Sequence, residues 1–365
     1  MPLARLTIVG TGLIGASLGL AARTKGVRVA GWDPDPRALS VAAERGAVER
    51  ADSLEDALAG AELVVVAAPI AALPAQVAAV LAASSGETTV TDVGSTKESV
   101  VAGAAGSPRF VGGHPICGSE AHGPENASAG LFEGATWFLT PTAHTDPDSH
   151  RLVHGFVSDL GAFPVVIDPV AHDRLVALTS HLPHVIANVI INRAGASRVE
   201  GHDAIASAGG SLRDMTRIAG ANPRMWIDIF IDNADALREE LADMRRRIEL
   251  VEEALAKGDV AFLADWIGEA AQNRRRMLES AYTDPGALQR VSVHVPDRPG
   301  VLAVIFQTLG AERINFQDFE FEHISPERGG TLNLLVGGEQ VAQKAAALLE
   351  SQGYGVVTGA VLDEG

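Results

Sequence analysis

Residues 6–15, Leu-Thr-Ile-Val-Gly-Thr-Gly-Leu-Ile-Gly, decide the fold of this chain. A short β-branched run is followed by three glycines and then by a helical pattern from Ala16 to Lys25. The Gly-x-Gly-x-x-Gly spacing allows a tight turn, a close approach to a pyrophosphate and close packing of helix on strand, while the helix start offers free N–H groups to the anion. The segment therefore predicts a strand, a phosphate-binding turn and a helix. Its predicted cofactor contacts are Gly10, Gly12, Leu13, Ile14 and Gly15.

An acidic residue follows at the position that a dinucleotide requires. Residues 27–32 are predicted to form the second strand, and Asp33 follows it, 18 residues beyond Gly15. A carboxylate there accepts hydrogen bonds from the adenosine ribose and repels a 2′-phosphate, which favours NAD over NADP. The apolar run 62–68 predicts a strand buried on both faces, and it ends at Pro69, where the chain should pass the cofactor. A βαβ unit that binds nothing is the alternative, and the combined pattern disfavours it.

Polar side chains follow another strand of the same predicted domain. Ser95 and Lys97 come after the strand predicted at residues 88–92, at its carboxyl end, where open α/β sheets place their ligands. Both are therefore candidate site residues, although Ser95 or Thr96 could instead cap the next helix. Two further strands are predicted at residues 136–140 and 163–167.

Residues 112–120, Gly-Gly-His-Pro-Ile-Cys-Gly-Ser-Glu, are predicted to form a loop after a short strand that ends at Val111. His114 stands between a glycine pair and a proline, so we expect its imidazole to be presented rather than held in a regular element. The alternative is a glycine-rich turn with an incidental histidine. Two alternatives are a metal site built from His114 and Cys117 with His181 and His184, and a cysteine nucleophile paired with His114. Both are disfavoured because hydride transfer to a dinucleotide needs neither. No metal is predicted.

From Val170 onward the pattern becomes helical, with the motif Ser180-His-Leu-Pro-His184 inside an apolar helix. Arg213 and Arg217 lie four residues apart and are suited to clamping carboxylates, the alternative being an ordinary solvated helix face. A long helix after Asn222-Pro223 predicts pairing with its copy in a homodimer. The predicted helices span residues 173–196, 223–256 and 260–280.

The tail after a linker at residues 282–288 has the order β-α-β-β-α-β of a ferredoxin-like unit. Its turns are predicted at residues 297–300 and at Gly329-Gly330. The whole chain is thus predicted to be α/β with three domains: a Rossmann-type dinucleotide-binding domain at residues 1–168, an all-helical substrate and dimerisation domain at 169–284, and a ferredoxin-like domain at 289–362.

Composition narrows the partners. The 365 residues are 47% apolar and 21% charged, with a net charge of −17 and a pI near 5.0. A strongly acidic chain opposes binding to phosphate backbones and anionic membranes, so neither nucleic acid nor a membrane is expected. The start has no signal-peptide pattern, no run approaches about 18 uninterrupted apolar residues, and the single cysteine fits a reducing compartment. We expect a cytoplasmic protein.

Five ordered motifs resemble those of the prephenate/arogenate dehydrogenases of tyrosine synthesis, over about residues 5–280. Beside the glycine segment with Ser17, they are Asp92-x-Gly-Ser-x-Lys97, Gly-Gly-His114-Pro-Ile-x-Gly-Ser-Glu120, Ser180-His-Leu-Pro-His184, and Asp214-x-Thr-Arg217-x-Ala219 with Met225-Trp226. The tail from Val291 resembles an ACT domain, a regulatory module that binds amino acids. In this family Arg213 stands where lysine is frequent and Cys117 where alanine is usual, so we interpret Cys117 as a packing residue.

The resemblance implies oxidative decarboxylation of prephenate to 4-hydroxyphenylpyruvate with hydride transfer to NAD. It implies that His114 accepts the ring hydroxyl proton, that Ser95 orients His114 and contacts the cofactor, and that Arg217 binds a substrate carboxylate. Further implied pocket residues are Glu120, Ser180, His181, His184, Arg213 and Trp226. Implied regulatory residues are Asp297, Gly300 and Asn315, with tyrosine as the expected effector.

Three alternatives stay open at this stage. Arogenate dehydrogenase would run the same chemistry on an amino side chain. Another NAD-dependent hydroxy-acid dehydrogenase would lack the two histidine motifs, and a redox or amino-acid sensor would not reduce NAD.

Overall fold

The computed structural model describes residues 3–117, 121–281, 284–325 and 329–361. Contacts between residues divide the chain into one compact unit of residues 1–246 and another of residues 247–365.

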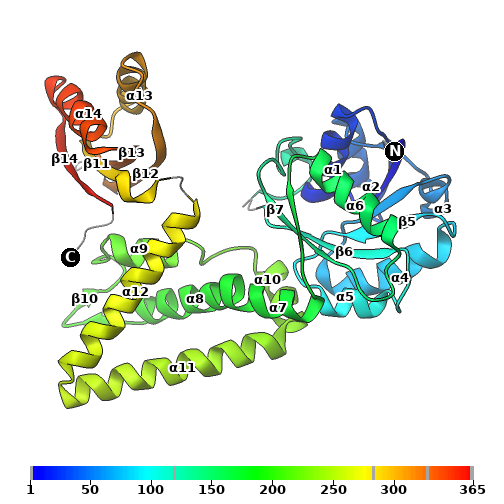
Figure 1. Cartoon of the computed structure of the whole chain (residues 1–365), viewed down its shortest axis with the longest axis horizontal. Coiled ribbons are helices and arrows are strands. Elements are labelled where there is room, and N and C mark those ends of the chain that lie inside the picture. Colours follow the sequence, from blue (N-terminus) through cyan, green and yellow to red (C-terminus); the bar gives the residue numbers. More distant parts are fainter. Residues whose placement is uncertain (1–2, 118–120, 282–283, 326–328, 362–365) are drawn as a thin grey trace. The chain divides into compact units, whose positions relative to one another are not determined.

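The first unit is built on an eight-stranded sheet in the order β3-β2-β1-β4-β5-β6-β7-β8. Figure 1 shows part of this sheet, with β5, β6 and β7 labelled. Neighbouring strands are parallel except for the antiparallel pair β6–β7. This order confirms the predicted dinucleotide-binding fold, and its direction reverses between β1 and β4, the point at which open α/β sheets bind ligands at the carboxyl ends of their strands. The strands are β1 Arg5–Val9, β2 Arg28–Trp32, β3 Glu49–Arg50, β4 Leu63–Val66, β5 Thr89–Asp92, β6 Phe110–Pro115, β7 Thr136–Thr140 and β8 Phe163–Val166.

Helices cover both faces of this sheet, which is why the run around β4 is apolar throughout. Leu63 and Val65 point into one core, while Val64 and Val66 point into the other. The first core includes residues of α1 Leu13–Thr24, α2 Pro36–Glu44 and α6 Pro147–Asp159. The second includes residues of α3 Leu54–Leu58, α4 Leu73–Ala83 and α5 Glu98–Gly103.

The predicted loop around His114 is wrong in its first half, because β6 continues through Gly112, Gly113 and His114 to Pro115. These residues pair with Thr140 to Trp137 of β7. Both glycines are required by space: a Cβ atom on Gly112 would lie 2.3 Å from Thr140 Oγ1, and one on Gly113 would lie 2.6 Å from the Asp92 carbonyl oxygen. The glycine pair therefore serves close packing rather than flexibility.

A nearly continuous helical path follows, made of α7 Pro169–Val176, a π-helical turn η3 Ala177–His181 and α8 Leu182–Gly195. Pro183 lacks the N–H that an α-helix uses and crowds the preceding turn, and the wider π turn accommodates it. The path is 27 residues long with a mean hydropathy of 1.4, enough by length and composition to cross a membrane. The core helix of a globular protein passes the same test. This path is 28% buried over its most apolar window and carries the buried polar residues His172, Asp173 and His181.

The long helix predicted from Pro223 is interrupted at Asn233. It forms α10 Pro223–Asp232 and α11 Ala234–Lys257, and the buried Asn233 side chain turns inward to donate to the Asp173 carbonyl oxygen at 2.8 Å. The polar side chain thus finds partners that a continuous helix would not give it. A short hairpin, β9 Arg198–Val199 with β10 His202–Asp203, and α9 Gly210–Thr216 complete this region.

The second unit contains α12 Val260–Ala281 and a four-stranded antiparallel sheet in the order β12-β13-β11-β14. The element order after η4 Pro285–Ala287 is β-α-β-β-α-β, as predicted. Gly329-Gly330 is not the hairpin turn: both residues begin β13, where a Cβ on Gly329 would lie 2.2 Å from the Val295 carbonyl oxygen. The elements are β11 Leu288–Val295, α13 Val301–Ala311, β12 Phe316–Ser325, β13 Gly329–Gly337, α14 Glu339–Ser351 and β14 Gly355–Ala360.

Candidate active site

The backbone beside His114 is held by a buried ion pair. The Lys97 ammonium pairs with the Asp92 carboxylate, and both side chains are fully buried. Lys97 Nζ also donates to the Gly113 carbonyl oxygen at 2.8 Å, while the Gly113 N–H donates to Asp92 Oδ1 at 3.0 Å. Burial lowers the pKa of Lys97, and the adjacent Asp92 opposes that shift. Both polar groups of Gly113 are therefore fixed, immediately before the candidate base.

The His114 imidazole contacts a second imidazole that the sequence did not single out. Nδ1 of His114 lies 2.9 Å from Nε2 of His172, and Nδ1 of His172 lies 2.7 Å from Asp173 Oδ1. His172 is fully buried on α7, whereas His114 keeps part of its surface in contact with solvent. A base, an orienting ring and a carboxylate thus stand in line.

Asp173 also joins the helical region to the sheet domain. Its Oδ1 accepts from the Lys97 N–H and its Oδ2 from the Glu98 N–H, both at 2.8 Å. These are free donors at the start of α5, so the carboxylate caps that helix from a distance of more than 70 residues in sequence. Ser99 Oγ donates to Asp232 Oδ2 at 2.8 Å, which ties α5 to α10 as well.

His181 and His184 form an aromatic group with α10. The His184 and Trp226 rings stack with centroids 3.5 Å apart, and His181 meets Trp226 edge-on at 6.1 Å. His184 Nδ1 lies 3.0 Å from the Ser180 carbonyl oxygen, which can only accept, so that nitrogen carries a proton. His181 Nδ1 lies 3.1 Å from Asn233 Nδ2, which can only donate, so the proton of neutral His181 is on Nε2.

All three predicted histidines are held neutral at physiological pH. Burial, followed by the nearby His172, Lys97 and His181, lowers the pKa of His114 well below its usual value. Burial lowers the pKa of His181 to about 4, against the opposing effect of Asp173. Burial likewise lowers the pKa of His184. A neutral imidazole can accept a proton, which the charged form cannot.

The glycine segment forms a cradle between the carboxyl end of β1 and the start of α1. A Cβ on Gly10 would lie 2.4 Å from the Ala67 carbonyl oxygen, and one on Gly15 would lie 1.9 Å from the Gly10 carbonyl oxygen. Apart from its chain neighbours, no atom of the described residues lies within 4 Å of a Cβ built on Gly12, and none of their side chains caps the start of α1 at Leu13. Open space at an uncapped helix start suits a pyrophosphate, so the residues fit a dinucleotide.

Asp33 directly follows β2, beside this cradle. Its Oδ2 accepts from the Thr11 hydroxyl at 3.1 Å, and its Oδ1 accepts from the Asp35 N–H at 2.8 Å. The carboxylate is thereby oriented at the position predicted for ribose recognition. Pro69 is exposed and directly precedes η1 Ile70–Ala72, against which α10 packs.

The remaining predicted site residues are Ser95, Glu120, Arg213 and Arg217. In the part of the chain that the structure describes, Ser95 makes no hydrogen bond to His114, and His172 takes that place instead. Arg213 is exposed on α9, and Arg217 is exposed at the carboxyl end of that helix, which packs against α8. Glu120 lies outside the described residues. The roles proposed for these residues remain predictions.

Sequence reasoning missed His172, Asp173 and Asn233. A signal was present, since a His-Asp pair and an asparagine stand among apolar residues of predicted helices, where a buried polar group needs partners. The described residues contain no group of three metal-binding side chains. Burial raises the pKa of Cys117 to about 11, as expected for a packing residue rather than a nucleophile.

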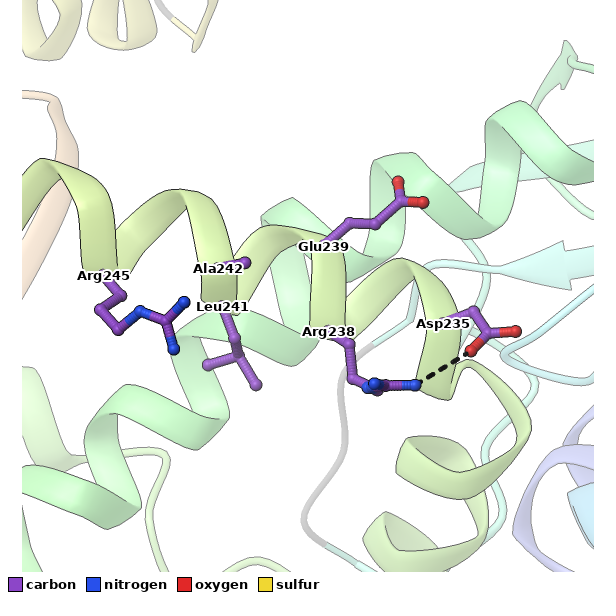
Figure 2. A pocket seen from close by; sticks show the side chains of 6 residues that line it. All are labelled: Asp235, Arg238, Glu239, Leu241, Ala242 and Arg245. Carbon is purple, nitrogen blue, oxygen red and sulfur yellow. Dashed lines mark ion pairs between the residues drawn. The ribbon is translucent and has the colours of Figure 1, made fainter.

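A separate hollow of about 650 Å³ lies along α11. Figure 2 shows that its lining side chains all project from this one helix, with an ion pair between Arg238 and Asp235 at 3.7 Å. Groups from several elements do not converge there, so it is not the candidate active site. The lining residues are Asp235, Arg238, Glu239, Leu241, Ala242 and Arg245.

Comparisons with known proteins agree with this geometry. Residues 18–166 match the family profile described as "Prephenate dehydrogenase, nucleotide-binding domain", and residues 168–269 match "Prephenate dehydrogenase, dimerization domain". The prephenate dehydrogenase of Bacillus subtilis is 29% identical over 357 residues, which cover 95% of this chain and 96% of the relative. The cyclohexadienyl dehydrogenase of Zymomonas mobilis is 31% identical over 276 residues, covering 74% of this chain and 94% of the relative.

A solved structure gives the same result. Prephenate dehydrogenase from Aquifex aeolicus, in complex with hydroxyphenyl propionate and NAD+, superposes with a TM-score of 0.71 and 29% identity, covering 76% of this chain and 99% of that one. The match therefore extends over both the sheet domain and the helical region that supplies His172, His181 and Asn233. This chain belongs to the prephenate dehydrogenase family.

Proposed function

We propose that this protein oxidises and decarboxylates prephenate to 4-hydroxyphenylpyruvate with NAD as the hydride acceptor, in tyrosine synthesis. The observation that carries the proposal is the neutral His114 imidazole at the carboxyl edge of a nucleotide-binding sheet. Its Nδ1 is engaged by His172 at 2.9 Å, which leaves Nε2 as the nitrogen that can take a proton from substrate.

The reaction balances with one base. The hydroxyl proton moves to His114 as a hydride leaves the same ring carbon, and the ring carboxylate departs as carbon dioxide. The electrons of that carbon–carbon bond complete the aromatic ring, and the proton returns to the phenolate oxygen. Bound NAD supplies the acceptor for the hydride. A positioned general base contributes about 10²–10⁴-fold to such a step.

The chain's own residues fit the cofactor. Gly12 and the uncapped start of α1 would hold the pyrophosphate, and the oriented Asp33 carboxylate would accept from the ribose hydroxyls and repel a 2′-phosphate. This arrangement favours NAD over NADP.

Anion recognition falls to the helical region. His181 Nε2–H is a donor because Asn233 occupies its other nitrogen at 3.1 Å, so it can donate to a substrate carboxylate. We propose that Arg217 supplies the charge for the second carboxylate, with Arg213, Ser180, His184 and Trp226 around the pocket. Glu120 is proposed as a further pocket residue.

The direct test mixes purified protein with NAD and prephenate and follows NADH absorbance. We expect turnover, and His114→Asn should lower it by about 100-fold or more while leaving NAD affinity unchanged. Unchanged turnover in that variant would remove His114 as the base. Arogenate, which differs by an amino group on the side chain, is the alternative substrate, and a side-by-side comparison of kcat/KM decides between them.

We further propose that the C-terminal sheet is an ACT-type module that binds tyrosine. A hollow of about 310 Å³ opens beside the turn after β11, within the usual range for small-molecule sites. Its lining includes Asp297, Arg298 and Gly300, and Gly300 adopts the left-handed conformation with φ +84°. Asn315 is proposed as a further regulatory residue. Calorimetry on the whole chain should detect an aromatic amino acid, and absence of heat with all of them would reject the module's role.

We propose a homodimer through the helical region. Ile227 and Ile231 of α10 are 59% and 74% exposed, which is a large apolar area to leave in water. Sedimentation as a monomer at micromolar concentration would contradict this. The proposed domains remain residues 1–168, 169–284 and 289–362, and the proposed location is the cytoplasm.

A further inference from the structure

We infer that His172 is a positioning residue that fixes the tautomer of His114, with the Asp173 carboxylate behind it. The inference deepens the proposed function and rests on it, because it specifies which nitrogen of His114 acts as the base. His172 and Asp173 thereby gain a role in turnover through His114.

The hydrogen-bond donors around Asp173 determine where the His172 ring carries its proton. Its two oxygens face three N–H groups, namely the Lys97 and Glu98 amides at 2.8 Å and His172 Nδ1 at 2.7 Å. A carboxylate can only accept hydrogen bonds, so it satisfies all three donors. Nδ1 of His172 must therefore carry a proton.

The position of the proton on His172 determines which nitrogen of His114 is protonated. A neutral His172 protonated on Nδ1 has a lone pair on Nε2, and the atom facing that lone pair at 2.9 Å is Nδ1 of His114. Nδ1 of His114 must then be the donor. Its Nε2 keeps the lone pair and has no hydrogen-bond partner among the residues that the structure describes.

The His172 ring is held in place by its surroundings. The His172 ring is fully buried and meets Phe138 edge-on at 5.4 Å and His114 at 5.1 Å. These contacts hold the ring plane in which its two nitrogens reach Asp173 and His114. Such a line of base, orienting group and carboxylate follows the logic of a catalytic triad, in which the carboxylate keeps its charge.

His114 changes its charge when it accepts the substrate proton. When Nε2 takes the substrate proton, His114 becomes a cation, which burial and the nearby His172 and Lys97 disfavour. The Asp173 carboxylate is the balancing negative charge, connected through His172. The arrangement therefore keeps His114 neutral at rest and supports it when it is transiently protonated.

Asp173 also has a purely structural role, because it caps α5 through two backbone N–H groups. Those two bonds do not pass through His172. Substitution of His172 therefore tests the positioning role while leaving the link between α7 and α5 in place.

The test compares His172→Phe, which keeps an aromatic ring but removes the acceptor, with His172→Gln, whose amide oxygen can still accept from His114. We expect His172→Phe to lower kcat about tenfold or more with KM values for prephenate and NAD within about twofold, and His172→Gln to recover part of the loss. His154→Phe, at an exposed position on α6, is the control and should be unchanged. Wild-type kcat in His172→Phe would overturn the inference.

A second measurement is independent of turnover. ¹⁵N NMR of histidine-labelled protein, with the His114 signals assigned from His114→Asn, reports which ring nitrogen carries the proton. We expect Nδ1–H in the wild type and a shift toward Nε2–H in His172→Phe. Nε2–H in the wild type would overturn the inference even if every His172 variant failed to fold. A wild type that turns over neither prephenate nor arogenate would instead reject the proposed function, and the tautomer would still be measured.

Discussion

Replacing Gly113 by alanine should displace His114, because backbone atoms fill the space that a Cβ needs. The added atom would lie 2.6 Å from the Asp92 carbonyl oxygen and 3.0 Å from Trp137 Nε1. Real Cβ atoms essentially never approach closer than 3.0 Å, and ordinary contact begins at 3.4 Å. The strand must therefore move by about 0.4 to 0.8 Å relative to β5.

That movement is large on the scale of the site. His114 is the next residue, and its Nδ1 lies 2.9 Å from His172. A shift of about 0.8 Å along that line would lengthen the contact to about 3.7 Å, which is no longer a hydrogen bond. Because a misplacement of about 1 Å can cost about 100-fold in rate, we expect kcat to fall by about 10- to 100-fold.

The assay is steady-state NADH formation with prephenate, together with NAD affinity, which should change little. Gly112→Ala offers a matched comparison, because its obstacle is the Thr140 hydroxyl at 2.3 Å, and Thr140→Ala in the same chain should restore activity. Gly155→Ala, on α6, meets no atom of the described residues within 4 Å beyond its own helix backbone and chain neighbours, and should be neutral. Wild-type kcat in Gly113→Ala, or a loss in Gly113→Ala no greater than in the rescued double variant, would refute the reasoning.

Three further outcomes are expected. A base acts unprotonated, and the lowered pKa of His114 places the acid limb of the kcat/KM profile below pH 6.5; a limb at or above that value contradicts it. Lys97→Met leaves the Asp92 carboxylate buried and unpaired, so a urea melt should show a loss of about 3–5 kcal/mol, part of which returns with Asp92→Asn added. Arg217→Ala should mainly raise KM for prephenate, and an unaltered KM would remove Arg217 from the carboxylate clamp.

Most of the fold could be predicted because its determinants are local. The glycine spacing at Gly10 to Gly15, the apolar run at β4 and the position of Asp33 each lie within one βα unit, so pattern alone identifies them. His114, His181 and His184 could be predicted as site residues for the same reason, since each belongs to a short local motif.

What the sequence left open depends on partners that are distant along the chain. Asp173 reaches Lys97 across 76 residues, and Asn233 reaches Asp173 across 60. Helical periodicity predicted one helix through Asn233, because a single asparagine lowers helix propensity only slightly. The hydrogen bonds of Asn233 to Asp173 and His181 interrupt the helix, and periodicity does not reveal them. The strand through Gly112 and Gly113 was missed because glycine has low strand propensity, whereas here close backbone packing required it.

These long-range contacts give the helical region a part in the chemistry as well as in substrate binding. His114 belongs to the sheet, but its tautomer depends on His172 of α7, and Asp173 both orients His172 and caps α5. The Asp173 carboxylate that holds α7 against α5 therefore also orients the base through His172. The dinucleotide cradle at Gly12 and Asp33 uses none of these bonds. A substitution that weakens the packing of α7 on α5 should therefore abolish turnover while NAD affinity is unchanged.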